Sequence, residues 1–352
     1  MLSQIAQNYL FHKPVSHPRG LRTNDRELQA AHSPRLPSQG LLAIMAATEA
    51  WEVRVTDFLK RYLHDGGDFK AAVVETTGVG RDFFAKTQPS PIGLQLLVQG
   101  MTGGLLLANG LKGEGSLLMV AKGNGPGEAL TVEANTAGHV RGTMTQPHIH
   151  IQPEPGLGLF QQVIGPGTLS VTRRTQKTPR GYQSVVDLVE GELSLNLANY
   201  LLNSDQVHSA IQLGSLLDPN LGIAGAGGIL IQAMPNANEN VLFILEQRLG
   251  ELPSLGELFT SPDAHQKITG HLFDGLEVSE VDTSQVTFSC PCSRQRMIQL
   301  LAALPIEELN AMRDENEPQS VTCHFCNQTF SISVEDLDVL IGAHRQAKKN
   351  GT

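Results

Sequence analysis

Apolar residues recur with helical spacing in three stretches of the chain after residue 56. The stretches are residues 57–63, which end near a Gly-Gly pair, residues 91–111 and residues 190–204. The second stretch is rich in leucine and predicts a mostly buried helix, although Gly103 and Gly104 lower its helix propensity. In the third stretch leucines recur every four residues, which predicts an amphipathic helix with one apolar face.

Other stretches have the composition and the flanking turn signals of β-strands. We expect strands at residues 69–77, 116–120, 129–133, 139–145, 168–174, 183–188 and 207–213. The glycines at residues 222–228 do not form a G-x-G-x-x-G motif, and no phosphate-binding lysine follows them. We therefore interpret them as close backbone packing at a strand rather than as a nucleotide loop. Together these elements predict an α+β domain with a large antiparallel sheet.

Residues 235–289 are expected to connect this domain to the C-terminal part of the chain. Residues 240–249 predict an amphipathic helix, after which prolines and glycines separate short apolar clusters. The pattern is compatible with ordinary irregular packing against the core. It is also compatible with a segment of low local stability, because strong helix caps are few.

The N-terminal part of the chain has a different composition. A chain of 352 residues is long enough for two globular units with linkers. Residues 1–48 contain four prolines among His, Arg and Ser, which predicts an extended or disordered arm. Five basic residues against two acidic ones would suit a transit peptide, but we favour a non-conforming extension or an upstream start, with Met45 as a candidate for the true beginning.

Composition and charge exclude several classes of function. The formal net charge of −9 disfavours a nucleic-acid binder, because phosphate binding needs clustered Lys and Arg. Aromatic residues make up 5% of the chain, so base-stacking platforms are not expected. The sequence contains no run of 18 or more apolar residues, so it predicts no membrane span. No G-x-S-x-G or related signature indicates catalysis.

All four cysteines of the chain lie in two tight pairs near its C-terminal end. They form a C-P-C motif at Cys290 and Cys292 and a C-H-F-C motif at Cys323 and Cys326. Four thiolates at such spacing predict a tetrahedral zinc site, and clustered cysteines suit a reducing cytoplasm. A disulfide across the C-x-C step would be strained and therefore easily reduced. The site is thus either an inert zinc site that folds the tail or a switch between zinc thiolates and disulfides.

The segment between the cysteine pairs predicts two short helices. One has an apolar stripe, and the other opens at Pro305 in its first turn. The stripe residues are Met297, Leu300, Leu301 and Leu304, followed by Leu309 and Met312. Two such helices have too little core to stand alone, so we expect their folding to depend on the metal.

Three other groups of polar residues are expected to form no site. His148 and His150 would lie on one solvated strand face, with no third ligand nearby. His324 is left out as a ligand because four thiolates already fill the shell. A small basic patch is expected to be a solvated loop rather than a partner site; it comprises Arg173, Arg174, Lys177 and Arg180.

Several motifs together resemble one known family. They are F-S-C-P-C-S at 288–293, I-E-E-L at 306–309, V-T-C-H-F-C-N at 321–327, the stretches 199–206 and 226–235, G-N-G-P-G at 123–127 and G-H-V-R-G at 138–142. In these motifs the chain resembles the heat shock protein 33 family of redox-regulated bacterial chaperones, over about residues 53–345.

The resemblance implies a division of the chain and a fold. We expect an extension at residues 1–52, an α+β chaperone core at 53–234, a metastable helical linker at 235–289, a four-cysteine zinc domain at 290–345 and a tail at 346–352. It also implies one Zn²⁺ per chain in the reduced form, held by Cys290, Cys292, Cys323 and Cys326.

The resemblance further implies an activity, which is that of an ATP-independent holdase and not of an enzyme. Peroxide or hypochlorite would close Cys290–Cys292 and Cys323–Cys326 disulfides, release zinc and loosen residues 235–289. The uncovered apolar surface would bind unfolded client proteins, and the oxidised form would dimerise. The alternatives are a constitutive zinc-ribbon interaction module and a thiol-disulfide oxidoreductase, which would need a thioredoxin-like context that the tail lacks.

Overall fold

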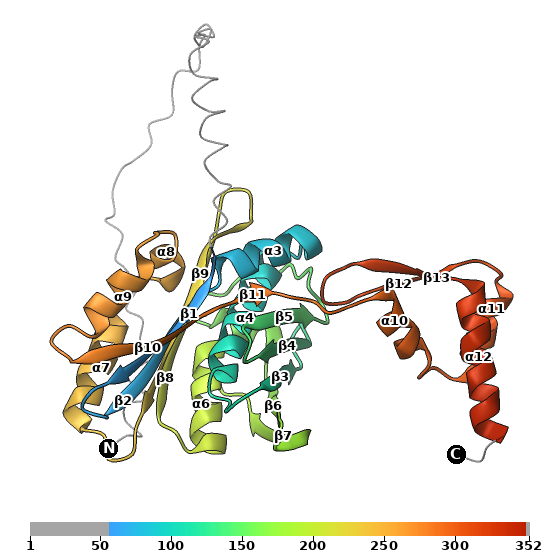
Figure 1. The fold of residues 1–352 in the computed structure, drawn as a ribbon. Helices are drawn as coiled ribbons and strands as arrows, with labels where there is room; N and C mark the ends of the chain where they lie inside the picture. Colours follow the sequence, from blue (N-terminus) through green and yellow to red (C-terminus); the bar gives the residue numbers. More distant parts are fainter. Residues whose placement is uncertain (1–55, 350–352) are drawn as a thin grey trace, which may run out of the picture. The chain divides into compact units, whose positions relative to one another are not determined.

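The computed structural model describes residues 56–349, and the side chains as far as residue 346. The predictions for residues 1–52, including the arm at 1–48 and the start at Met45, therefore lie outside the described residues. Within them the chain is an α+β protein with two large sheets and a two-stranded one, which confirms the predicted fold class (Figure 1). The predicted antiparallel sheet is thus two sheets, with one short parallel pairing added to the second.

The first sheet has five antiparallel strands and is covered on both faces. In spatial order its strands are β10 (Val278–Gln285), β1 (Phe58–His64), β2 (Phe69–Glu75), β9 (Ile223–Ala233) and β8 (Ser209–Leu217). The prediction of a helix at residues 57–63 is wrong, because this stretch is β1. Leu59 and Tyr62 pack into different core clusters on opposite faces of the sheet. A strand buried on both faces lacks a clear alternation, so its apolar spacing resembled that of a helix.

The second sheet has six strands. In spatial order they are β11 (Thr287–Phe288), β5 (His139–Met144), β4 (Ala129–Asn135), β3 (Gly115–Gly123), β6 (Gly167–Thr175) and β7 (Thr178–Asp187). All pairs are antiparallel except β11 and β5, which run parallel. The strands predicted from residue 116 to residue 188 are confirmed.

Helix α4 (Pro91–Ala108) lies between the two sheets and contacts β8 and β9 on one side and β4 and β5 on the other (Figure 1). Ser90 caps its N-terminus, because the Ser90 hydroxyl accepts a hydrogen bond from the Gly93 N–H at 3.2 Å. A Cβ on Gly103 would lie 2.5 Å from Leu197, and one on Gly104 would lie 2.6 Å from Val132. The glycines that lower helix propensity are therefore required by close packing.

By length and composition alone, α4 is the one described helix that could cross a membrane. However, 78% of that window is buried inside the protein. Its apolar character is therefore accounted for by the two sheets that cover it, as in the core helix of a globular domain.

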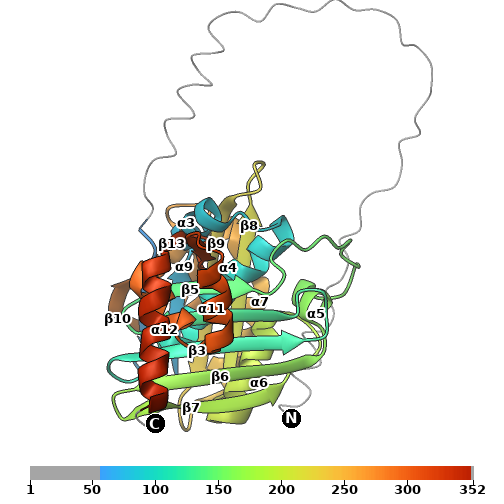
Figure 2. The ribbon, with the colours of Figure 1, turned by 90° about the vertical axis from the view of Figure 1, so that its right-hand side faces the viewer.

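Three further helices complete the core. They are α3 (Thr77–Thr87), α5 (Leu159–Ile164) and α6 (Leu193–Asp205), of which α6 confirms the prediction for 190–204 (Figure 2). Helix α3 was not predicted. Its N-terminal N–H groups, those of Gly78 and Val79, donate to the buried Asp57 carboxylate at 2.9 and 2.6 Å. The cap comes from 20 residues away in the chain, so no local motif announces the helix.

Arg173 is not part of a solvated loop, as the sequence had suggested. It lies on β6, and its guanidinium donates to both oxygens of Asp205 at 2.8 and 2.7 Å. The same group lies 5.3 Å from the centre of the Tyr200 ring. Arg173 thus joins the second sheet to α6, whereas Arg174 beside it is exposed.

The helical part of residues 235–289 covers the outer face of the five-stranded sheet, and the two strands that follow belong to the sheets themselves. Residues 235–289 form α7 (Glu239–Glu251), α8 (Leu255–Leu258) and α9 (Ala264–Leu272), followed by the edge strand β10 and the short strand β11 (Figure 1). We call α7, α8 and α9 the linker helices. Beneath them lie apolar side chains of the sheet, and from above come Leu245, Leu249, Leu255, Phe259, Ile268 and Leu272.

Glycines set the distance between α8 and the sheet. A Cβ on Gly225 of β9 would lie 2.3 Å from the Gly256 carbonyl oxygen, and one on Gly227 would lie 2.2 Å from the Phe259 ring. The interpretation of residues 222–228 as close backbone packing is confirmed, and the neighbouring backbone belongs to the linker helices.

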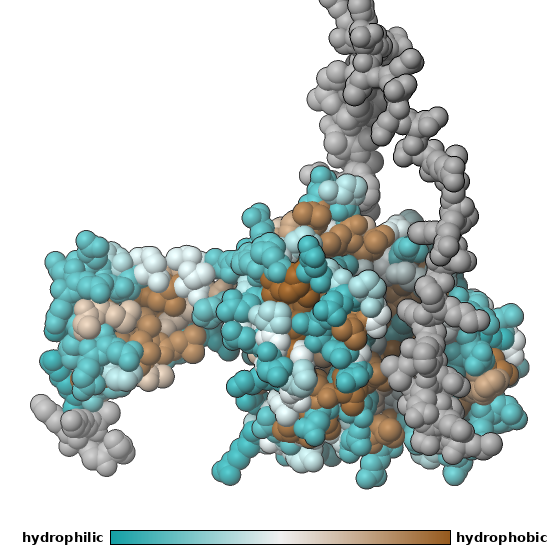
Figure 3. Space-filling view, turned by 180° about the vertical axis from the view of Figure 1, so that it is seen from behind, coloured by the Kyte–Doolittle hydropathy of each residue, from teal (hydrophilic) through white to brown (hydrophobic). Residues whose placement is uncertain are grey.

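The C-terminal part has a small core of its own. Its elements are α10 (Arg294–Leu301), α11 (Ile306–Asp314), β12 (Gln319–Thr322), β13 (Thr329–Ile332) and α12 (Val334–Lys349). Figure 3 shows apolar residues gathered in the middle of this region, with hydrophilic ones around them. The buried side chains are Met297, Leu301, Leu309, Ile332, Leu337, Leu340 and Ile341.

Two details of the prediction for this region are wrong. Leu300, placed on the apolar stripe, is 61% exposed, because the buried face of α10 follows Met297 and Leu301. Pro305 precedes α11 as its cap residue instead of lying in the first turn. Helix α12 was not predicted, and it supplies three of the buried side chains named above.

His265 of α9 is held in an apolar site. Neither of its buried ring nitrogens has a hydrogen-bond partner among the described residues, and the ring packs edge-on against Phe259 at 5.9 Å. The charged groups that face it are Lys60 of β1 and Glu280 of β10, which pair with each other at 3.1 Å. Asp263, the residue before α9, forms an exposed pair with Lys267 of that helix. Burial is the main cause that lowers the pKa of His265 from 6.5 to about 4. The positive charge of Lys60 lowers this pKa further, and the negative charge of Glu280 opposes the shift.

Acid should therefore loosen this segment. Because the folded-state pKa of His265 lies below its unfolded value, the stability that neutral His265 permits is lost as the pH falls from about 6.5 to about 4. The measurement is urea unfolding of the reduced protein at pH 7 and at pH 4.5, for wild type and for His265→Leu. Between these two pH values, the free energy of unfolding should fall by about 2 kcal/mol more in wild type than in the variant. Equal falls in the two proteins would contradict this.

Candidate metal centre

The two cysteine motifs lie in two loops that the fold brings together. Cys290 and Cys292 follow β11 and lead into α10, whose N-cap Ser293 accepts a hydrogen bond from the Arg296 N–H at 3.2 Å. Cys323 and Cys326 lie in the turn between β12 and β13. There the Asn327 N–H donates to the Cys323 carbonyl at 2.8 Å.

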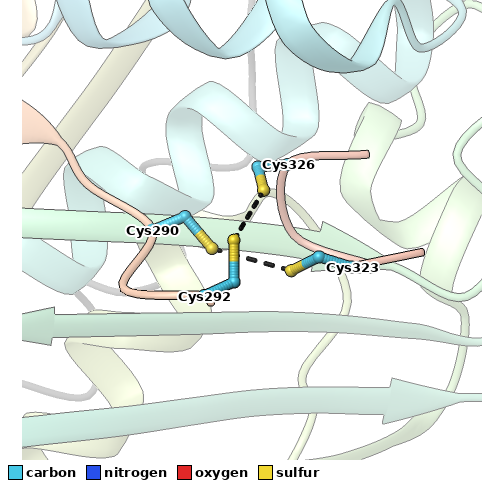
Figure 4. Close-up of side chains that lie close together, drawn as sticks. All are labelled: Cys290, Cys292, Cys323 and Cys326. Carbon is cyan, nitrogen blue, oxygen red and sulfur yellow. Dashed lines mark hydrogen bonds between the residues drawn. The ribbon is translucent and has the colours of Figure 1, made fainter. Parts of the chain in front are cut away.

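The four sulfur atoms lie within 4.8 Å of one another (Figure 4). The Sγ atoms of Cys290 and Cys323 are 3.7 Å apart, and those of Cys292 and Cys326 are 3.3 Å apart. A tetrahedron with Zn–S bonds of about 2.3 Å has sulfur–sulfur edges of about 3.8 Å. The donor set and its spacing therefore fit a closed four-thiolate metal site, and no ligand has to come from elsewhere in the chain.

Burial makes several anionic sulfurs costly without a cation. Burial is the largest influence on the Cys290 thiol and opposes ionisation, but hydrogen bonds from Arg141 and from the Cys292 N–H lower the pKa of Cys290 overall. Burial raises the pKa of Cys292 and of Cys326. A divalent cation would offset the mutual repulsion of four thiolates and this desolvation cost.

Residues of the core hold the second loop. The Thr143 hydroxyl on β5 donates to the His324 carbonyl at 2.9 Å, and the Asn327 side-chain amide donates to the Thr87 carbonyl at 3.2 Å. Neither contact was predicted, because Thr143 and Thr87 belong to no recognisable ligand motif. The structure thus places the centre against β5 and the end of α3.

Histidines take no part in this centre. Within residues 56–349, the four cysteines are the only His, Cys, Asp or Glu group of three or more placed to hold one ion. His148 and His150 are exposed as predicted, but they lie in an irregular segment after β5 and not on a strand. Ile149 between them is buried, so they flank a packed side chain.

Comparison with known proteins decides the family. The family model described as Hsp33 protein matches residues 57–333, which lies within the expected range of 53–345. The chain belongs to the Hsp33 family. The resemblance inferred from the motifs is therefore confirmed, and with it membership of a family of chaperones.

Relatives and a solved structure agree with this assignment. The 33 kDa chaperonin of Desulforamulus reducens is 33% identical over 287 residues, covering 81% of this chain and 97% of the relative. That of Lactiplantibacillus plantarum is 32% identical over 290 residues, covering 82% and 98%. The crystal structure of the Hsp33 homologue of Thermotoga maritima matches with a TM-score of 0.74 and 26% identity, covering 83% of this chain and 99% of that one.

Removing one sulfur should disrupt metal binding. Cys326→Ser replaces a buried thiol of the cluster by a hydroxyl that is a poor zinc ligand. Loss of a hydrogen bond to a metal ligand typically costs roughly 10–100-fold in metal affinity, and loss of a ligand should cost more. We expect such a fall in zinc affinity when it is measured by competition with a chromophoric chelator. Thr322→Ser, one residue before the second pair, is the matched control and should bind zinc normally. Undiminished zinc stoichiometry in Cys326→Ser would refute the ligand assignment.

Proposed function

We propose that this chain is a redox-regulated, ATP-independent holdase of the reducing cytoplasm, which binds unfolding client proteins without catalysing a reaction. The observation that carries the proposal is the four-thiol cluster of this Hsp33 family member. The cluster follows directly, in the chain, the segment that covers the core sheet. The domain limits at residues 53–234, 235–289 and 290–345 are part of this proposal.

In the reduced state, Cys290, Cys292, Cys323 and Cys326 are the proposed ligands of one Zn²⁺. A closed four-sulfur set favours zinc over harder cations. Bound zinc would supply the positive charge that keeps all four sulfurs anionic and ties the two loops together. Core residues Thr143 and Thr87 then hold the second loop against the protein.

In the oxidised state, the proposed disulfides are Cys290–Cys292 and Cys323–Cys326. Each pair of thiolates loses two electrons to one molecule of hydrogen peroxide, which takes up two protons from solvent and becomes two molecules of water. In the reduced structure two sulfur–sulfur contacts run between the loops, Cys290–Cys323 at 3.7 Å and Cys292–Cys326 at 3.3 Å. Closing the pairs within each loop therefore needs the sulfurs to turn, and it removes the thiolates on which metal binding depends.

The linker helices are joined to the centre through two strands. Strand β11 ends at Phe288, two residues before Cys290, and Phe288 packs against Phe83 of α3 with ring centres 5.6 Å apart. Directly before β11, β10 pairs with β1 over its whole length. Loss of the metal tie would release β11 first, and fraying would then pass into β10 and the helices before it.

The proposed client surface is the sheet face under the linker helices. It carries the buried side chains Tyr62, Phe69, Ala71, Val73, Ile229 and Ile231. A contiguous apolar face of this kind binds unfolded chains without requiring a particular sequence. An exposed face of this kind would also suit self-association, so we propose that the oxidised form is a homodimer.

Oxidation should switch the activity on. We expect the peroxide-treated protein to suppress light scattering by a thermally unfolding client several-fold better than the reduced, zinc-loaded protein, because the apolar face is then uncovered. A thiol titration with a zinc-release assay should report the loss of four thiols and one zinc together. Equal activity in both states would contradict the activation, and resistance of the thiols to peroxide would favour a constitutive zinc module.

Lifting α8 should bypass oxidation. Gly225→Ala places a methyl group 2.3 Å from the Gly256 carbonyl oxygen and 2.7 Å from the Thr260 N–H nitrogen, so the linker backbone must move. The reduced, zinc-loaded variant should suppress client aggregation several-fold better than reduced wild type. Gly250→Ala is the control, because a Cβ there meets nothing within 4 Å. An inactive Gly225→Ala variant whose linker is cleaved readily by protease would exclude this face as the client surface.

A further inference from the structure

Arg141 of β5 is a core residue that reaches the metal centre. It is 8% exposed, and its guanidinium Nη1 donates to Cys290 Sγ at 3.4 Å. It belongs to the G-H-V-R-G motif, which the cysteine-based account of function leaves unexplained. The contact joins the core sheet directly to a proposed metal ligand.

Glu133 of β4 fixes the orientation of this guanidinium. Residues 133 and 141 face each other in the antiparallel pairing of β4 and β5. Glu133 Oε2 accepts hydrogen bonds from Arg141 Nε at 3.0 Å and from Nη2 at 2.6 Å. Because Nε and Nη2 are occupied on one edge, Nη1 on the other side is directed at the sulfur.

The same guanidinium also contacts the second loop. Its central carbon lies 4.0 Å from the centre of the Phe325 ring, and Phe325 lies between Cys323 and Cys326. One side chain of the core therefore touches the C-x-C loop through a sulfur and the C-x-x-C loop through an aromatic face. A planar guanidinium with several N–H groups can make both contacts at once while bound to Glu133, which suits it better than the compact ammonium of lysine.

We propose that Arg141 is a positioning residue of the metal centre, through which metal binding and docking of the C-terminal region on the core stabilise each other. With metal bound, Cys290 is an anion that accepts a charge-assisted hydrogen bond, which is stronger than one to a neutral thiol. By linkage, the factor by which docking raises metal affinity equals the factor by which metal strengthens docking. The inference rests on the metal assignment proposed above but is independent of the chaperone activity.

The test is zinc affinity of the reduced full-length protein, measured by competition with a chromophoric chelator. Arg141→Gln should weaken zinc binding by about 10-fold or more, the usual effect of losing a hydrogen bond to a metal ligand. Arg141→Lys keeps the charge and should recover only part of the loss. Glu133→Gln leaves Arg141 in place but frees its orientation, so it should give a smaller loss of several-fold. Arg174→Gln, an exposed arginine of the same sheet, is the control and should bind zinc as wild type does.

A double-mutant cycle separates positioning from general destabilisation. Arg141→Gln and Phe325→Leu should together cost less in zinc affinity than the sum of their separate effects, because the two side chains act through one contact. Additive effects, or an Arg141→Gln affinity within twofold of wild type, would overturn the inference. Should Arg141→Gln fail to fold, an unchanged affinity in Glu133→Gln overturns it instead. Weak zinc binding by wild type itself would refute the metal assignment.

Discussion

Four sulfur atoms within 4.8 Å of one another set the main constraint on this protein. As thiolates they repel one another, and burial adds a desolvation cost, so their close approach is stable only with a cation among them or with the sulfurs protonated or bonded in pairs. Each of these conditions changes the charge of the two loops. In the proposed function, the position of the C-terminal region would therefore depend on the chemical state of the sulfurs.

The connectivity of the chain makes this dependence relevant to the core. The linker helices lie between the core strands and the cysteines in sequence, and they cover the outer face of the five-stranded sheet in space. A segment that has left the sheet has fewer accessible conformations when both of its ends are still held than when only one end is held. Release of β11 at the metal centre therefore increases the entropy gained when the linker helices leave the sheet.

The contacts of the linker helices are suited to reversible docking. At α8 the packing depends on Gly225, Gly227 and Gly256, which let the backbone of α8 and the Phe259 ring come close to the sheet. At α9 the site includes His265, whose ring nitrogens are buried without hydrogen bonds among the described residues. Buried polar atoms of this kind cost free energy, which places the segment at the less stable end of the structure.

Local sequence patterns were sufficient for the elements whose signals are local. Helices α4 and α6 were predicted from the spacing of their leucines. Most strands of the two large sheets were predicted from their composition and from the turn residues beside them. The clustering of the four cysteines was predicted from the C-x-C and C-x-x-C spacing, and the structure brings those four sulfurs together. Short-range spacing carries this information because the residues involved are neighbours in the chain.

The tertiary structure alone decided the features that depend on distant residues. Strand β1 is buried on both faces, so its pattern resembled a helix, and α3 is capped by Asp57 from outside its own sequence. The contacts of Arg141 with Glu133, Cys290 and Phe325 could not be predicted, because they join β4, β5 and two loops that meet only after folding. The sequence determined which sulfur atoms are available as metal ligands, and the fold determined which core residues contact their loops.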